Sequence, residues 1–300
     1  VIVTVVVVAG TADGIGQGSL FGSASHMPPK YTQAIVSGTS VSGVVISLLR
    51  IVTKLVAGGD DKGSGSQRSS SYVYFGVAAA FCFACIIVQS LLPRLAVRKH
   101  YDGILQDQKQ QLSRNESAVR GLQEGGQKGP SIWALFVSIW PLAIGLFSTY
   151  AVTLSIFPGF LAEDVESKAL GDWLSIGLIT LFNIFDFAGK SLPVYEAFRI
   201  HKPMKLFVLS LVRLLFYPMY AFAVLGPVGV VKKDPLGPIY LSVITIALGF
   251  SNGILTSNCI MEAPGQVSLP NAERTEMLII WFLLLGLLVG ALLGWIWLIL

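Results

Sequence analysis

Eight long apolar stretches constrain this sequence more than any other feature. A helix of about 20 mostly apolar residues is long enough to cross a lipid bilayer. The stretches lie at 1–24, 32–57, 72–95, 132–158, 170–192, 204–226, 238–262 and 276–300. The chain is 53% hydrophobic and only 13% charged, which is about half the charged share of a typical soluble domain. The pattern predicts an all-α membrane protein that crosses the bilayer eight times.

A long polar segment at 96–131 divides the apolar stretches into two groups, one in 1–95 and one in 132–300. Its composition predicts a solvated linker that is partly helical or disordered. Because cytoplasmic loops carry an excess of Lys and Arg, the linker is predicted to be cytoplasmic and the C-terminus non-cytoplasmic. Most Lys and Arg residues lie in this linker and in the alternate loops 25–31, 190–205 and 263–275.

Polar and charged residues interrupt two of the apolar stretches. Asn183, Asp186 and Lys190 recur at helical spacing, and Asp13 and Gln17 are four residues apart, so each set shares one helix face. An aspartate at mid-bilayer costs at least about 2.5–3.5 kcal/mol. These side chains therefore predict a water-filled cavity between the helices. The alternative is that Asp186 and Lys190 form a purely structural ion pair.

The sequence offers no sign of an enzyme, a cofactor or a metal site. It has no P-loop, H-E-x-x-H or G-x-S-x-G motif. Cys82 and Cys85 form a C-x-x-C, but within an apolar stretch that offers no second pair of ligands. The net charge of +4 is interpreted as a sign of topology rather than of nucleic-acid binding. Glycines recur every four residues in the first and last stretches, which predicts close helix packing there.

Four motifs carry a resemblance to a known family. They are "QGSLFG" at 17–22, "FNIFDFAGKSL" at 182–192, "SNGILTS" at 251–257 and "ERTEMLIIWFLLLGLLVGALLGW" at 273–295. In these motifs and in their order, the whole chain resembles the equilibrative nucleoside transporter family. The segments "PGFLAED" and "LGDW" are most similar to plant members.

The resemblance implies a fold and a division into bundles. Family members have eleven spanning helices in a major-facilitator-like arrangement of six and five. We therefore expect the first three helices to be absent from this sequence. On that basis 1–95 completes the first bundle, 96–131 is the cytoplasmic linker and 132–300 forms the second bundle.

The resemblance also implies substrate-binding residues. Gln17 would hydrogen-bond the nucleobase edge, since its amide carries both donors and an acceptor. Asp186 would accept from the ribose hydroxyls and Lys190 would donate to them, while Asn183 would orient the pair. Lys190 stands where many relatives have Arg, which replaces a planar fork with a point charge. The expected extracellular gate is formed by Phe157 and Pro158.

We hypothesise that transport is coupled to protons and that Asp13 lies in the proton path. Some relatives carry Gly at this position and run passively, whereas plant members are often proton-coupled. Pairing of Asp13 with a basic residue on a missing helix stays an open alternative. The predicted protein is a monomer in the lipid bilayer that moves purine or pyrimidine nucleosides by alternating access. We expect it in the plasma membrane, with a vacuolar or other endomembrane as the alternative.

Two other functions compete with the carrier. An intramembrane aspartyl protease would also place two aspartates in spans, but neither Asp13 nor Asp186 has the G-x-G-D context of that class. A channel or a non-transporting receptor is the second alternative. No repeated filter loop is visible in the sequence. Saturable and competable uptake distinguishes a carrier from both.

Overall fold

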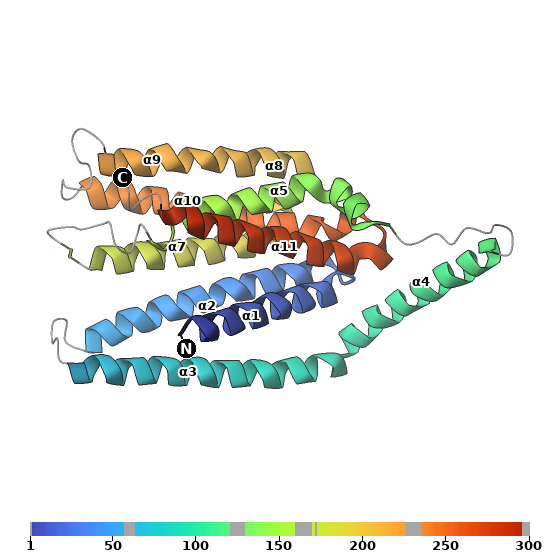
Figure 1. Ribbon diagram of the computed structural model, residues 1–300, viewed down its shortest axis with the longest axis horizontal. Helices are drawn as coiled ribbons and strands as arrows, with labels where there is room; N and C mark the ends of the chain where they lie inside the picture. Colours follow the sequence, from blue (N-terminus) through green and yellow to red (C-terminus); the bar gives the residue numbers. More distant parts are fainter. Residues whose placement is uncertain are drawn as a thin grey trace. The chain divides into compact units, whose positions relative to one another are not determined.

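The described part of the chain folds into helices (Figure 1). The computed structural model describes residues 2–56, 64–120, 130–159, 170–171, 173–225 and 236–295. No strand occurs in these residues, which confirms the predicted all-α class. The long helices are α1 (Ile2–Ala24), α2 (Pro29–Val56), α3 (Ser64–Leu91), α4 (Ala96–Arg120), α5 (Ile132–Ile156), α7 (Trp173–Ser191), α10 (Leu236–Glu262) and α11 (Leu269–Gly294). The shorter ones are η1 (Leu92–Arg94), η2 (Leu192–Val194), η3 (Glu196–Phe198), α8 (Pro203–Val212), η4 (Arg213–Leu215), α9 (Phe216–Leu225) and η6 (Pro264–Gln266).

The described helices confirm a protein that crosses the membrane several times, although not the count of eight. Five segments are long and apolar enough to span a bilayer, or six if the bent pair Ala79–Arg94 and Ala96–Gln108 is one span. The stretches 1–24 and 170–192 do form α1 and α7, but neither is among the five. Both contain charged and amide side chains, Asp13 and Gln17 in α1 and Asn183, Asp186 and Lys190 in α7. The number eight therefore stays a prediction.

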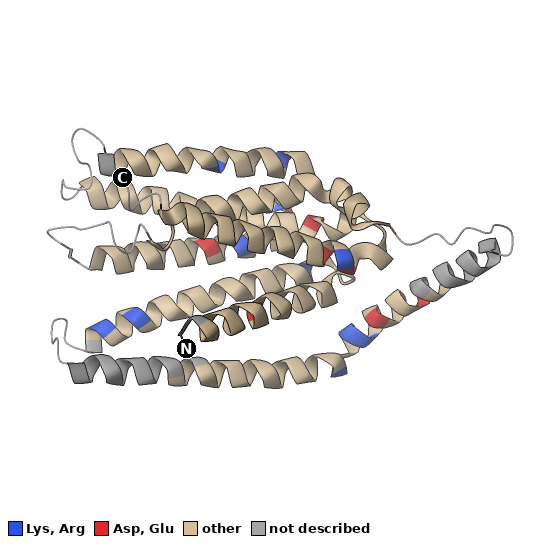
Figure 2. Ribbon diagram, viewed as in Figure 1, with Lys and Arg blue, Asp and Glu red and all other residues tan. Residues whose placement is uncertain are grey.

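The described chain divides into two compact units. The first contains Val1–Val44 and Lys128–Leu300, and the second contains Val45–Gln127. In the second unit, α3 and α4 meet at η1 with a bend of 57°. The predicted linker is thus partly helical, because α4 covers most of it. Figure 2 shows several charged residues along α4. Arg98 and Asp102 of this helix form an ion pair.

The core of the first unit lies where α5, α10 and α11 meet. Ile139 and Leu142 of α5, Cys259 of α10 and Ile279 of α11 are completely buried in one apolar cluster. Side chains that are buried all along a membrane helix require other helices on that face rather than lipid. The core therefore forms on the inner faces of the helices that run side by side in this unit (Figure 1).

Glycines bring α11 close to α5. A Cβ atom placed on Gly286 would lie 2.6 Å from the Phe147 carbonyl oxygen, and one on Gly290 would lie 2.7 Å from that of Ala151. No side chain fits at such distances, so these positions are restricted to glycine. The predicted close packing of the last helix is confirmed at both positions.

The first helix packs on α11 more loosely. Gly22 faces Met277, whose Cε would lie 3.1 Å from an added Cβ, and Gly14 faces Leu284 at 3.6 Å. Gly10 and Gly18 have nothing within 4 Å of an added Cβ. The glycine repeat of α1 therefore contacts its neighbour at alternate members only.

The backbone of α7, which carries Asp186 and Lys190, lies very close to the backbone of α10. A Cβ on Gly253 would lie 2.7 Å from the Lys190 backbone nitrogen and still closer to the Asp186 carbonyl oxygen. A Cβ on Gly249 would lie 2.6 Å from the Phe182 carbonyl oxygen. The two backbones touch over two turns, which fixes the height of α7 against α10.

Candidate functional site

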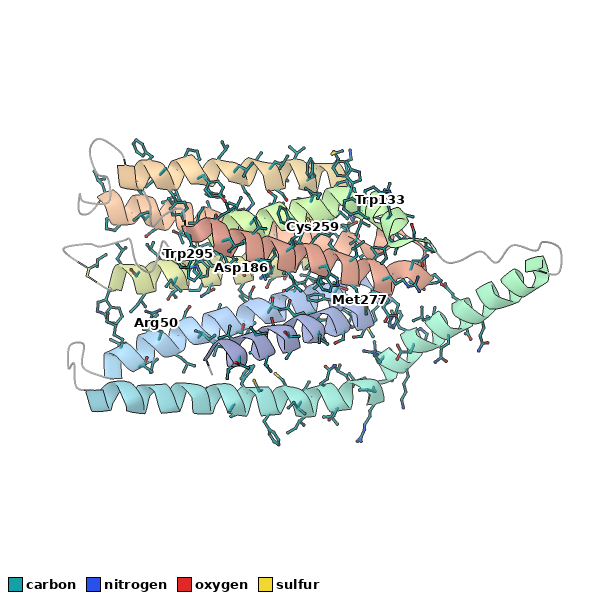
Figure 3. All side chains as sticks on the ribbon, viewed as in Figure 1. Arg50, Trp133, Asp186, Cys259, Met277 and Trp295 are labelled. Atoms are coloured by element: carbon teal, nitrogen blue, oxygen red, sulfur yellow. The ribbon has the colours of Figure 1, made fainter. Side chains whose placement is uncertain are left out.

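A buried ion pair lies at the centre of the first unit. Asp186 Oδ2 is 2.9 Å from Lys190 Nζ, one turn further along α7. Each residue keeps only 5% of its surface exposed, and Figure 3 shows Asp186 inside the bundle. Burying an ion pair is tolerable only when further hydrogen bonds satisfy its remaining atoms. The contacts around the pair meet that requirement.

Two neighbouring helices complete the hydrogen bonding of the carboxylate. Ser40 of α2 donates to Asp186 Oδ2 at 2.6 Å. Asn252 of α10 donates through Nδ2 to Asp186 Oδ1 at 2.7 Å. Both oxygens are therefore occupied by protein donors. Asp186 is held as a fully bonded side chain in this conformation.

The C-terminal end of α7 is fastened by side chains as well. The last carbonyl groups of a helix lack partners within the helix. The Lys190 carbonyl oxygen accepts from Gln33 Nε2 at 2.9 Å, Ser37 Oγ at 3.1 Å and Ser257 Oγ at 2.9 Å. Side chains of α2 and α10 thus replace the missing backbone donors, and they hold the base of the Lys190 side chain in place.

A second buried cation joins the same network. Arg213 donates to Thr153 Oγ1 at 2.6 Å, and Thr153 donates to Asn252 Oδ1 at 2.8 Å. Arg213 begins η4, shortly before Pro218. Pro218 cannot donate to the Leu214 carbonyl, so the backbone there tightens into a 3₁₀ turn. Asn252 and Thr153 consequently connect Asp186 to the guanidinium group of Arg213.

A cavity of about 200 Å³ opens beside this network. It is formed by α1, α2, α5, α7, α10 and α11 within the first unit. The polar residues of its wall are Gln17, Thr39, Tyr150, Lys190 and Thr256, and the apolar ones are Phe21, Val36, Ile260, Leu283 and Leu287. Polar groups that converge on an otherwise apolar cavity are typical of small-molecule sites.

One wall residue has an unused hydrogen-bonding group. Thr256 is 1% exposed and its Oγ1 has no partner among the described residues. A buried hydroxyl without a partner costs free energy, and such groups in native proteins are rare enough to require an explanation. Tyr150 and Lys190 belong to the same wall, and Lys190 is held by its ion pair with Asp186. The wall therefore offers an oriented ammonium group and a free hydroxyl to whatever enters.

The structure brings two of the predicted binding residues, Gln17 and Lys190, to the cavity wall. Asp186 lies behind Lys190 and reaches the wall only through it. Asn183 lies against α2, with its Oδ1 2.7 Å from the Cβ position of Gly43. The amide that bonds Asp186 is Asn252 instead.

The remaining predicted residues lie outside the cavity wall. Asp13 is exposed and accepts a hydrogen bond from Gln17 Nε2 at 2.9 Å. Phe157 stacks on Phe182 of α7 with ring centroids 3.9 Å apart, and Pro158 is exposed just beyond the end of α5. The gate and proton-path roles therefore stay predictions.

Sequence reasoning did not assign four residues that the structure places in the site: Ser40, Tyr150, Asn252 and Thr256. Two of them belong to the polar run 251–258 in α10, and the amide and hydroxyl groups of that run inside an apolar stretch were the available signal. Ser40 lies in the small, weakly polar run 37–43 of α2, which was a weaker signal of the same kind. Tyr150 had none, because isolated Tyr residues are common in membrane helices.

No metal centre is formed by the described residues. Nowhere in this part of the chain do three His, Cys, Asp or Glu side chains gather as metal ligands. Cys82 and Cys85 are both exposed and unbridged on α3.

These features define a helical membrane protein with a polar cavity inside its bundle, a class that includes the membrane carriers. The chain belongs to the nucleoside transporter family, whose sequence model matches residues 2–299. It is 35% identical to equilibrative nucleotide transporter 1 of Arabidopsis thaliana, with 98% of this chain and 62% of that protein covered. It is 38% identical to equilibrative nucleotide transporter 8 of the same plant, with 98% and 68% covered. The chain thus spans about two thirds of the length of these relatives.

Proposed function

We propose that this protein carries nucleosides across a membrane by alternating access. The cavity beside Lys190 is the observation that supports the proposal, together with membership of the nucleoside transporter family. Its volume of about 200 Å³ is below the about 300–1,000 Å³ typical of ligand pockets. The described conformation is therefore interpreted as a closed form that widens when substrate enters.

The chemistry of the wall fits an uncharged nucleoside. Gln17 supplies an amide for the base edge, and Lys190 and Thr256 supply polar groups for ribose hydroxyls. Asp186 acts first by orienting Lys190, and it contacts ribose itself only if Ser40 or Asn252 releases an oxygen. These roles are proposals for the residues named.

The same wall disfavours a nucleotide, although the relatives are named nucleotide transporters. Lys190 is the one charged residue of the described wall, and its charge is already paired with Asp186. A phosphate group would therefore lack an unpaired cation. An excess of unlabelled adenosine is expected to abolish uptake of radiolabelled adenosine, whereas adenosine 5′-monophosphate is not. Equal competition by both compounds would contradict this assignment.

Transport by alternating access requires two bundles that move against each other. We propose 1–95 as part of one bundle, 96–131 as a cytoplasmic linker and 132–300 as the other bundle. The C-terminus would then be non-cytoplasmic, and the plasma membrane is the proposed location. Uptake that saturates and is competed by unlabelled nucleoside would exclude a channel or a receptor.

Thr256→Val tests whether the cavity is the substrate site. The change removes the free hydroxyl and keeps the shape of the side chain. A lost hydrogen bond of about 0.5–1.5 kcal/mol should raise KM for adenosine about 2–12-fold, with the protein still folded. The matched control is Thr180→Val in α7, whose hydroxyl bonds only its own helix at Ile176 and which should keep the wild-type KM. An unchanged KM in Thr256→Val would place the substrate elsewhere.

Asp13→Asn tests proton coupling through Asp13. Because Asp13 accepts from Gln17, protonation of this carboxyl would change how the Gln17 amide is held. Uptake of wild-type protein driven by an imposed pH gradient is expected to exceed uptake without the gradient. An amide at this position cannot take up the proton, so the variant should lose this stimulation while keeping equilibrative uptake. Unchanged gradient dependence would remove Asp13 from the proton path.

A further inference from the structure

A carboxyl group that does not belong to the cavity wall lies buried in the packed interior. Glu276 is in the second turn of α11 and has 0% of its surface exposed. Neither of its carboxyl oxygens has a hydrogen-bond partner among the described residues. The two other buried carboxyl groups of the described residues are paired, Asp186 with Lys190 and Glu262 with Arg199. Glu276 therefore differs from them in having no cationic partner among the described residues.

The helices that pack against α11 bring no countercharge to Glu276. The described elements that pack most extensively on α11 are α5, α1 and η6. Residues of α10 and α2 join α11 in the same apolar cluster, and Lys30 at the start of α2 is exposed. The only ionisable side chain of α5 is Tyr150, that of α1 is Asp13, and η6 has none. Tyr150 belongs to the cavity wall together with Lys190. Asp13 is exposed and adjoins Gly14, which faces Leu284, so it lies about 12 Å along α11 from Glu276.

The other charged groups nearby are also unavailable. On α11 itself, Glu273 and Arg274 are exposed, and Glu273 contacts the Gly22 position of α1. At the end of α10, Glu262 is bonded to Arg199 at 2.8 Å and to His201 at 3.2 Å. An ionised carboxylate that is buried without a partner is strongly disfavoured, and such a group takes up a proton instead.

We propose that Glu276 is a proton-binding site, which holds a proton while it is buried in the packed interior and releases it when that interior opens to water. The site is close to the cavity, because Leu283 of the cavity wall lies seven residues further on, about 10 Å away along the same helix. Opening of the bundle around the cavity would thus wet Glu276. Coupling of this proton to uptake rests on the proposed nucleoside transport, whereas proton binding itself does not.

Infrared spectroscopy of the purified full-length protein tests proton binding without any transport assay. A protonated carboxylic acid has a carbonyl stretching band that a carboxylate lacks. The wild-type protein near neutral pH is expected to show this band, and Glu276→Gln should lose it. Glu273→Gln is the matched control, since it removes an exposed carboxyl one turn earlier on α11 and should leave the band in place. A wild-type protein without the band, or a Glu276→Gln protein that keeps it, overturns the proposal.

Uptake at two external pH values then tests the coupling. Wild-type uptake is expected to be higher at the lower pH, and Glu276→Gln should lose this dependence and remain active, because glutamine imitates the protonated form. His201 needs a separate control, because its hydrogen bond with Glu196, followed by the charge of Glu262, raises its pKa above the usual range of histidine. His201→Gln should keep the pH dependence of uptake.

The two readouts separate the possible failures. A lost band together with a lost pH dependence supports the whole proposal. A lost band with an unchanged pH dependence overturns the coupling. If the wild-type protein takes up no nucleoside but shows a band that Glu276→Gln removes, the proton site stands and the proposed transport function fails.

Discussion

Uptake of adenosine by an Asp186→Ala variant is expected to fall at least about hundredfold. The change leaves Lys190 buried at 5% exposure without its countercharge and leaves Ser40 and Asn252 without their acceptor. Removing one member of a buried ion pair destabilises the conformation that orients Lys190 by about 3–5 kcal/mol. Each 1.4 kcal/mol lowers the population of that conformation about tenfold. Radiolabelled uptake, normalised to protein at the membrane surface, measures the effect.

A double variant separates folding from function. Asp186→Asn combined with Lys190→Met removes both charges, so no unpaired ion remains buried, and surface expression should recover. Uptake should not recover, because the oriented ammonium group of the cavity wall is gone. Normal saturable uptake by a surface-expressed Asp186→Ala protein, or by the double variant, would show that the pair is structural only.

Gly253→Ala is expected to destabilise the protein by about 1–3 kcal/mol, the usual range for overpacking. The added methyl group would lie 2.7 Å from the Lys190 backbone nitrogen, so α7 and α10 have to separate. Separation also moves Asn252 away from Asp186, since Asn252 precedes Gly253 directly. The thermal midpoint of the detergent-purified protein should fall, and uptake should fall with it.

The matched control for this prediction is Gly177→Ala. Gly177 lies in α7, the helix that Gly253 of α10 contacts, but it has nothing within 4 Å of an added Cβ. Alanine is the better helix former by about 1 kcal/mol, so this variant should be as stable as the wild type or more so. A Gly253→Ala protein with a wild-type midpoint would mean that the helices tolerate a wider spacing.

The sequence predicted most of the helices because apolar run length depends on local composition alone. It also predicted the pairing of Asp186 with Lys190, since residues four apart on one helix must meet. Contacts between helices were harder to predict. The resemblance implied that Asn183 orients the pair, whereas the amide bonded to Asp186 comes from α10. Which helices adjoin is decided by packing, and one sequence does not encode it in a local pattern.

The glycines illustrate the same limit. Gly10, Gly14, Gly18 and Gly22 form a regular repeat, and only two of them face a neighbouring helix closely. Gly249 and Gly253 of α10 make a single four-residue spacing and Gly189 of α7 makes none in its helix, yet together they allow the two backbones to touch. Their spacing has meaning only once the two helices are placed together. The buried position of Glu276 could likewise not be read from its flanks, where charged residues suggest a helix end at the membrane surface.

The hydrogen bonds from α2 to α7 have a consequence for the transport cycle. Gln33 and Ser37 hold the Lys190 carbonyl, and Ser40 holds Asp186. In the proposed division α2 and α7 belong to different bundles. Each change between the inward- and outward-facing conformations therefore has to break these contacts and form them again. Their combined strength then sets a kinetic barrier. Weakening them should make the empty carrier reorient faster, with an effect on turnover rather than on affinity.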